Sequence, residues 1–386
     1  MPRVTSLFVL SLAASLLMIG VGMIVAIMPE RVYAASGNLQ SVSLIASVFA
    51  VSYLLAQLPA GILSDRFGAR VFLVLGYGVC GLSGLVFFFS PSADGILFGR
   101  LIQGIGEAPI WALGPALLSR AYAQSKGRAI GLYNAAIHAG LTLGPLAGLA
   151  IGASGDSNLP FLIFAALCFA GGLAIFLLLP EETRHAEPAL SGKADPRALL
   201  RVMTEGRHAV LFSGVLLYGA CYGIFVSVLP ISLTLLNGFG GQETGILFFL
   251  FYAAISLSQV VAGPLSDRHG RRGFLIGGMA LAALGFGTVF FVPGLWALGP
   301  LFLASLGLGA FCVASIADLS EAVQPDLRGT VSGGYYLFWA IGYFAGPQVI
   351  GLFGAGAQET GYAVLGLVLA GQTLAMLFFL GARKQT

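Results

Sequence analysis

The sequence predicts an all-α membrane protein in which twelve transmembrane helices form two pseudo-symmetric six-helix bundles. Composition is the first reason: 58% of the 386 residues are apolar and 9% are charged, whereas a soluble domain carries about 25% charged residues. The second reason is a series of apolar runs of about 20 residues, the length that crosses a bilayer, and the third is an internal repeat. A mean hydropathy of +0.93 excludes a soluble enzyme, a nucleic-acid-binding domain and a disordered scaffold.

Short segments rich in charged or turn residues separate the apolar runs and place six spans in each half. The first six spans are expected near residues 5–28, 40–63, 71–90, 95–119, 129–152 and 160–179. A polar segment follows, and six more spans are expected near residues 209–236, 244–265, 273–292, 295–320, 330–354 and 361–381. The sequence therefore predicts an N-terminal bundle at 1–180, a linker at 181–208 and a C-terminal bundle at 209–386.

Basic residues lie almost entirely on one side of this topology. Twelve spans put both termini and the linker on the same side, and 17 of the 19 Lys and Arg residues fall there. The exceptions are Arg100, inside the fourth span, and Arg31, on the opposite face. Because cytoplasmic loops are enriched in Lys and Arg, we expect both termini to be cytoplasmic and the protein to lie in a bacterial-type inner membrane. The net charge of +3 reflects this topology and indicates no nucleic-acid partner.

Two segments of the chain repeat each other. Residues 61–70 (GILSDRFGAR) and 263–272 (GPLSDRHGRR) are identical at seven of ten positions, at an offset of 202. Glycine, tyrosine and proline matches at the same offset extend this register over several spans. Parallel repeats are typical of transporters whose halves rock around a site near the bilayer midplane. We therefore expect transport by alternating access.

The repeated segment resembles the signature of the major facilitator superfamily between its second and third spans, G-x-L-x-D-R-x-G-R-R. Ala69 replaces the first of the two closing basic residues in the first copy, whereas the second copy has both. In the family this element latches the halves together on the cytoplasmic side, and the resemblance, which covers essentially the whole chain, assigns that role here. The predicted gating residues are Gly61, Asp65, Arg66, Gly68, Arg70, Gly263, Asp267, Arg268, Gly270, Arg271 and Arg272.

Simple chemistry suits these gating residues to such a role. Gly61 and Gly68 permit tight helix-to-loop turns, and the Asp65 carboxylate can accept hydrogen bonds at the N-terminus of a neighbouring helix. Arg66 and Arg70 can bridge to carboxylates or to anionic lipid headgroups. The alternative for the arginines is that they only anchor the cytoplasmic side.

A polar stripe runs along the fourth span. At 100° per residue, Arg100, Gln103, Glu107 and Trp111 share one helix face. A charge at the centre of a membrane helix costs about 2.5–3.5 kcal/mol on insertion scales, so this face is expected to meet water, a partner or substrate. The hypothesis is that Glu107 is the proton-coupling group, with Arg100 beside it. The alternative is a static Arg100–Glu107 pair that holds helices together.

The string R-x-x-x-G-x-G-E that contains this stripe resembles that of the organic anion:cation symporters and the Spinster-like lipid transporters. In those proteins the glutamate is linked to coupling, and the resemblance implies the same for Glu107.

The fifth span carries a glycine face. Gly140-x-x-x-Gly144-Pro145-x-x-Gly148 resembles the family's antiporter motif, which is characteristic of exporters, particularly drug:proton antiporters. A generic small-residue packing face explains the same glycines, and span 11 has a similar surface. The predicted helix-packing residues are Gly140, Gly144, Pro145, Gly148, Gly342, Gly346 and Pro347.

The remaining polar and aromatic residues outline a cavity. His138, on the face of span 5 nearly opposite the glycines, titrates near neutral pH when unperturbed and is a candidate to share protons with Glu107. A satisfied structural histidine is the alternative. The second half contributes mainly aromatic rings, which supply apolar area for an amphipathic substrate but also occur in ordinary packing. The predicted cavity residues are Gln57, Gln103, Trp111, Asn134, Tyr218, Tyr222, Gln259, Tyr336, Trp339 and Tyr343.

The sequence contains no motif for a metal, a nucleotide or a catalytic nucleophile, so we expect no enzyme activity and no cofactor, with a proton gradient as the energy source. The prediction is a proton-coupled exporter (antiporter) of amphipathic small molecules, whose partners are its substrate, protons and membrane lipids. The family resemblance favours a functional monomer. Two alternatives stay open: a proton symporter that takes up an organic anion bound by Arg100, and a transporter-like membrane sensor.

Overall fold

A computed structural model describes residues 2–122, 124–152, 158–180, 206–323 and 328–381, and these residues are almost entirely helical. The helices of the first half are α1 (Pro2–Ser36), α2 (Leu39–Phe67), α3 (Ala69–Phe89), α4 (Ala93–Ala121), α5 (Lys126–Gly152) and α6 (Leu159–Leu178). Those of the second half are α8 (Gly206–Val226), α9 (Val228–Asn237), α10 (Gly241–His269), α11 (Arg271–Thr288), α12 (Leu298–Glu321), α13 (Arg328–Leu352) and α14 (Gln358–Phe379). Short 3₁₀ turns occur at Val289–Phe291, Gly294–Ala297 and Ala355–Ala357. Most of the predicted linker, residues 181–205, lies outside the described residues.

The helices match the predicted spans. Within the described part of the chain, eleven helices are long and apolar enough to cross a membrane. The remaining predicted span, the eleventh, corresponds to α13, which has 25 residues but contains several Gly and Tyr residues that lower its hydropathy. Together with the related structures reported below, this confirms the predicted fold class.

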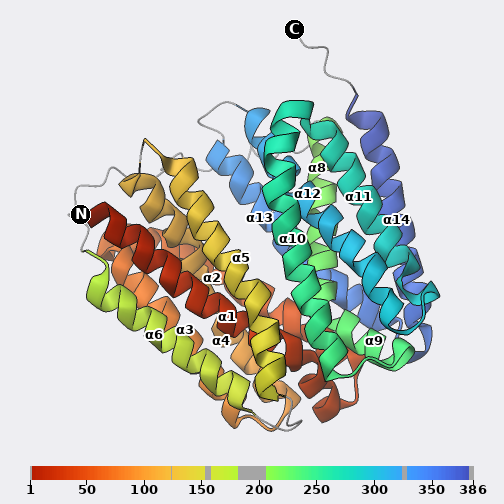
Figure 1. The fold of residues 1–386 in the computed structure, drawn as a ribbon, viewed down its shortest axis with the longest axis horizontal. Coiled ribbons are helices and arrows are strands. Elements are labelled where there is room, and N and C mark those ends of the chain that lie inside the picture. Colours follow the sequence, from red (N-terminus) through yellow and green to blue (C-terminus); the bar gives the residue numbers. More distant parts are fainter. Residues whose placement is uncertain (1, 123, 153–157, 181–205, 324–327, 382–386) are drawn as a thin grey trace. The chain divides into compact units, whose positions relative to one another are not determined.

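The chain forms two compact units, Met1–Ala189 with Gly240–Phe249 and Leu190–Phe239 with Leu250–Thr386. In the first unit α1 packs on α5 and α6, and α3 packs on α4 and α6. In the second unit α8 packs on α13 and α14, and α11 packs on α12 and α14 (Figure 1). These pairings of the first unit are thus reproduced by the corresponding helices of the second, as the sequence repeat predicts.

Small residues let the paired helices approach closely. A Cβ atom at Gly140 of α5 would lie 2.8 Å from the carbonyl oxygen of Ser15 on α1, and one at Gly346 of α13 would lie 2.7 Å from Ala220 Cα on α8. The other predicted packing residues lie at the same two interfaces: Gly144, Pro145 and Gly148 at α1, and Gly342 and Pro347 at α8. The glycine faces therefore bring helix backbones together.

The seventh predicted span is not one continuous helix, and this corrects the sequence prediction. Ser227 leaves helical geometry (φ −128°, ψ −81°) and separates α8 from α9. Pro230 contributes to the break, because in a continuous helix its ring would clash with the carbonyl of Val226, where α8 ends. The Ser227 hydroxyl also donates to the carbonyl of Gly223 at 2.6 Å and competes with the helical bond. The repeat partner of Ser227 is Ala26, which has no hydroxyl, and α1 continues through Pro29 to Ser36.

Candidate functional site

The polar stripe of the fourth span lies on the buried face of α4. The helix begins after Ser92, whose hydroxyl oxygen accepts a hydrogen bond from the Gly95 N–H at 3.2 Å, a side-chain cap that fixes the start of the helix. Arg100, Gln103 and Glu107 are 3%, 0% and 4% exposed. Three strongly polar side chains are therefore buried, and each needs hydrogen-bond partners.

A continuous hydrogen-bonded chain supplies those partners. Arg100 Nη1 donates to Gln103 Oε1 at 2.8 Å, and Gln103 Nε2 donates to Glu107 Oε1 at 2.8 Å. The half-buried Trp111 donates its Nε1–H to Glu107 Oε2 at 3.0 Å. Both carboxylate oxygens of Glu107 are thus acceptors, and Gln103 stands between the two charges. The choice between a proton-coupling role and a static pair that holds helices together stays a prediction.

Helix α2 completes the surroundings of Arg100. Arg100 Nε donates to the carbonyl of Ile45 at 3.1 Å, and the guanidinium carbon lies 4.5 Å from the centroid of the Phe49 ring. The Phe49 ring stacks on Tyr53 with centroids 5.8 Å apart, and Gln57 Nε2 donates to the Tyr53 hydroxyl at 3.2 Å. Of these α2 residues only Gln57 was predicted from the sequence, although Phe49, Tyr53 and Gln57 follow the i, i+4 spacing of one helix face.

Two predicted cavity residues lie on α5. Asn134 is exposed and His138 is half-buried, whereas the glycines of the same helix face α1. Tyr133 is 2% exposed, and its hydroxyl lies 2.5 Å from where a Cβ at Gly114 of α4 would be. The position of Tyr133 shows that α5 also packs on α4. The functional roles of His138 and Asn134 stay predictions.

The aromatic candidates of the second unit form one cluster. The Tyr222 ring centroid lies 5.9 Å from that of Trp339, 6.1 Å from that of Tyr343 and 6.3 Å from that of Tyr218. Trp339 and Tyr343 stack with centroids 4.9 Å apart. Phe251 of α10, which sequence analysis missed, joins the cluster 5.1 Å from Tyr222. Helices α8, α10 and α13 therefore supply a joint aromatic surface.

The remaining candidates of the second unit are placed differently. Tyr336 is 45% exposed and its ring contacts its neighbour Tyr335, with centroids 5.7 Å apart. Gln259 is half-buried on α10. Among the described residues, the ring of Tyr336 forms no ring pair with the aromatic cluster.

The first gating segment differs in one respect from the prediction. Gly61 lies inside α2 and has no positive φ, so it is not a turn residue; the same holds for Gly263 inside α10. The turns are made by Gly68 (φ +95°) and Gly270 (φ +86°) alone, because α2 and α10 continue to the residue before each of them. Arg70 donates to the carbonyl of Phe176 and lies over its ring. The side chains of Asp65 and Arg66 lie outside what the structure describes.

The second gating segment forms an ionic cluster within its own unit. Arg271 Nη2 lies 2.6 Å from a carboxylate oxygen of Asp267 and 2.6 Å from one of Glu321, and Nη1 donates to the Ser266 hydroxyl at 2.9 Å. Arg272 donates to the carbonyl of Leu377 at 3.2 Å. Arg268 is exposed. The cluster ties the α10–α11 turn to the end of α12.

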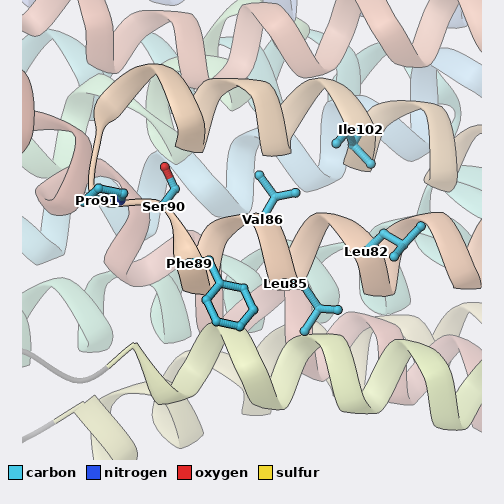
Figure 2. Close-up of a pocket in the computed structure, with 7 residues that line it drawn as sticks. All are labelled: Leu82, Leu85, Val86, Phe89, Ser90, Pro91 and Ile102. Carbon is cyan, nitrogen blue, oxygen red and sulfur yellow. The ribbon is translucent and has the colours of Figure 1, made fainter.

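An apolar groove of about 680 Å³ lies where α3 meets α4, and Figure 2 labels the residues that line it. Its lining residues are Leu82, Leu85, Val86, Phe89, Ser90, Pro91 and Ile102. It shares no residue with the polar chain of α4, and it offers a single hydroxyl to orient a ligand. We therefore do not regard it as the candidate site.

Duplicated bundles of apolar helices with a buried chain of ionisable and amide side chains define a membrane transporter. The sequence profile of the Major Facilitator Superfamily matches residues 10–347 and again 211–386. The chain belongs to this family, whose members are transporters and not enzymes.

Known proteins resemble most of the chain. A class C tetracycline resistance protein of Escherichia coli is 26% identical over 360 residues, which are 89% of this chain and 88% of the relative. The proton-coupled antiporter flippase LtaA of Staphylococcus epidermidis is 24% identical over 300 residues, 76% of this chain and 73% of the relative. A crystal structure of a bacterial homolog of the human lysosomal transporter Spinster superposes with a TM-score of 0.78 at 19% identity, over 98% of this chain and 95% of that one.

Proposed function

We propose that this protein is a proton-coupled exporter that exchanges amphipathic small molecules for protons by alternating access. The observation that carries the proposal is Glu107, a carboxylate only 4% exposed in the middle of a membrane helix, with a hydrogen-bond donor on each oxygen. An ionisable group inside a membrane is costly and typically marks an ion or substrate pathway. Glu107 is thus the group we assign to carry the proton.

The direction of transport rests on the relatives and on α5. The names of the two relatives describe resistance to tetracycline and proton-coupled antiport, and the glycine face of α5 resembles the antiporter motif. The aromatic cluster of Tyr222, Trp339 and Tyr343 supports an amphipathic substrate, because rings supply apolar area and their polar atoms orient a ligand. No cofactor enters this proposal, since the proton gradient supplies the energy.

We further propose that the protein is a functional monomer in the inner membrane with both termini cytoplasmic. The distribution of Lys and Arg supports this orientation. Single-cysteine labelling of the two ends in sealed cells tests it, and ends found on opposite sides of the membrane would refute it.

Transport measurements in proteoliposomes test the function. A thermal-shift screen that begins with tetracycline selects a ligand, and an internal pH dye then reports proton movement when this ligand is added. Exchange predicts protons moving opposite to the ligand. Movement in the same direction would establish the symporter alternative, and a ligand that stabilises the protein without any movement would establish the sensor.

The variant Glu107→Gln tests the proton-coupling group. It keeps the shape of the side chain and removes its titration, so we expect gradient-driven transport to be lost while exchange of ligand for ligand persists. Glu30→Gln, an exposed carboxylate at the end of α1, is the matched control and should retain both. Gradient-driven transport by Glu107→Gln at the wild-type rate would overturn the assignment.

A further inference from the structure

We propose that Gln103 is a positioning residue that transmits the protonation of Glu107 to Arg100 by turning its side-chain amide. This inference rests on the proposed role of Glu107 and adds a route by which the bound proton alters the protein.

The groups on either side of Gln103 in the polar chain determine how its side-chain amide is oriented. Arg100 and Trp111 can only donate hydrogen bonds. Gln103 must therefore present its oxygen to Arg100 and its NH₂ group to Glu107, as the 2.8 Å contacts on either side show. Trp111 donates to the other oxygen of Glu107 at 3.0 Å. All three hydrogen bonds are satisfied when Glu107 is an ionised carboxylate.

A proton on Glu107 is incompatible with this arrangement. The acid O–H needs an acceptor, and neither Gln103 Nε2 nor Trp111 Nε1 can accept. The acceptor within the chain is Gln103 Oε1, which receives the hydrogen bond from Arg100. When the amide turns to receive the acid proton, its NH₂ group faces the donors of Arg100 and the Arg100–Gln103 hydrogen bond breaks. The proton arrives from solvent on Oε1 of Glu107 and leaves from the same atom.

Loss of the Arg100–Gln103 hydrogen bond also affects a second helix, α2. Arg100 is held on α2 by the carbonyl of Ile45 and the ring of Phe49, and on its own helix by Gln103. Loss of the Gln103 bond leaves the guanidinium attached to α2 alone. Helix α2 ends immediately before Gly68, which makes the turn of the first gating segment. Protonation of Glu107, relayed through Gln103, therefore changes the contact between α4 and the helix that leads into this turn.

The titration of other groups near α4 must be distinguished from that of Glu107. The middles of the helices around α4 carry Tyr53 on α2, Tyr77 and Cys80 on α3, Tyr133 and His138 on α5, and Cys168 on α6, whereas α1 has no titratable side chain between Val4 and Pro29. Phenols and thiols ionise at about pH 10 and 8.5 when unperturbed, which leaves His138 as the group to exclude. All measurements below are therefore repeated in His138→Gln.

A double-mutant cycle tests the relay. The infrared band of a protonated carboxylic acid, assigned by its absence in Glu107→Gln, first locates the pH at which Glu107 titrates in purified protein. The coupling between Arg100→Met and Gln103→Met in thermal unfolding is then measured above and below that pH. We expect a coupling of about tenfold in the unfolding equilibrium when Glu107 is ionised, and none when it is protonated. In the Glu107→Gln background, which has no acid to titrate, the coupling should be equal at both pH values.

The Tyr53–Gln57 pair provides the control, because it is also a hydrogen bond between two side chains of one helix, at 3.2 Å. The coupling between Tyr53→Phe and Gln57→Met should not change with pH. An Arg100–Gln103 coupling that is equal at both pH values overturns the relay and leaves the proposed function intact. If no Glu107 band titrates, the proposed proton-coupling role fails instead.

A second measurement covers the case in which Arg100→Met does not fold. In protein labelled with ¹³C-glutamine, the side-chain carbonyl band of Gln103 is assigned by difference against Gln103→Met. The relay predicts that this band shifts on acidification, because its donor changes from Arg100 to the acid of Glu107, and that it stays constant in Glu107→Gln. A constant band in the wild-type protein across the Glu107 titration refutes the relay.

Discussion

The close approach of α1 and α5 makes a strong prediction for two glycines of the same helix. A Cβ at Gly140 would meet the carbonyl oxygen of Ser15 at 2.8 Å and the backbone N of Ile19 at 3.0 Å, whereas a Cβ at Gly131 would meet nothing within 4 Å. Backbone atoms of α1 cannot rotate away as a side chain can. Gly140→Ala therefore forces the two helices apart, and Gly131→Ala does not.

The magnitudes follow from two opposing terms. Replacing Gly by Ala inside a helix favours folding by about 1 kcal/mol, and this term is common to both variants. Overpacking a close interface costs about 1–3 kcal/mol, and this term applies to Gly140→Ala alone. The two variants should therefore differ by about 1–3 kcal/mol in the free energy of unfolding.

Thermal unfolding in detergent measures the difference. Cys80, Cys168 and Cys221 are buried, so a thiol-reactive dye reports their exposure as the protein unfolds. We expect Gly131→Ala to raise Tm slightly and Gly140→Ala to lower it by several degrees relative to Gly131→Ala. The repeat provides a second pair, Gly333→Ala and Gly342→Ala of α13. Equal Tm values within each pair would refute the argument that the glycine faces are close-packed.

Two further predictions concern buried charges. Arg207 donates two hydrogen bonds to Asp318, at 2.7 and 2.9 Å, so Arg207→Leu should cost about 2–4 kcal/mol in unfolding free energy by leaving a buried carboxylate unpaired. Glu321→Gln, at an exposed pair, should cost less than about 1 kcal/mol, and a similar loss in both variants would contradict the role of burial. Phe49→Leu removes the ring under Arg100 and should destabilise the protein by about 1–2 kcal/mol, measured by the same melting assay. Phe49→Tyr keeps the ring and serves as control; equal stability of the two variants would exclude a contribution from the ring face.

Local patterns in the sequence were sufficient to predict several features of the structure. Helix spans follow from long apolar runs, because a bilayer demands about 20 apolar residues wherever the chain crosses it. The shared face of Arg100, Gln103 and Glu107 follows from the helical period alone. The duplicated packing of α1 on α5 and α8 on α13 follows from glycines repeated at one offset.

Other features were not predicted, because a residue type that permits a break or a turn does not by itself decide where a helix ends. At the break between α8 and α9, the Ser227 hydroxyl and Pro230 act together. The matching proline of α1, Pro29, has no such hydroxyl before it, and α1 is continuous. Gly61 was predicted to form a turn because glycine permits one, but α2 continues through it to Phe67.

The sequence by itself determined that the chain spans a membrane twelve times, that its halves are copies, and that an acid lies within the fourth helix. Tertiary structure decided what that acid and its neighbours bond to. The carbonyl of Ile45 and the ring of Phe49 meet Arg100 only after α2 and α4 pack together. A hydrogen bond between helices depends on their separation and rotation, and these are set by the packing of all the side chains between them, whereas the period of a single helix is a property of its own backbone.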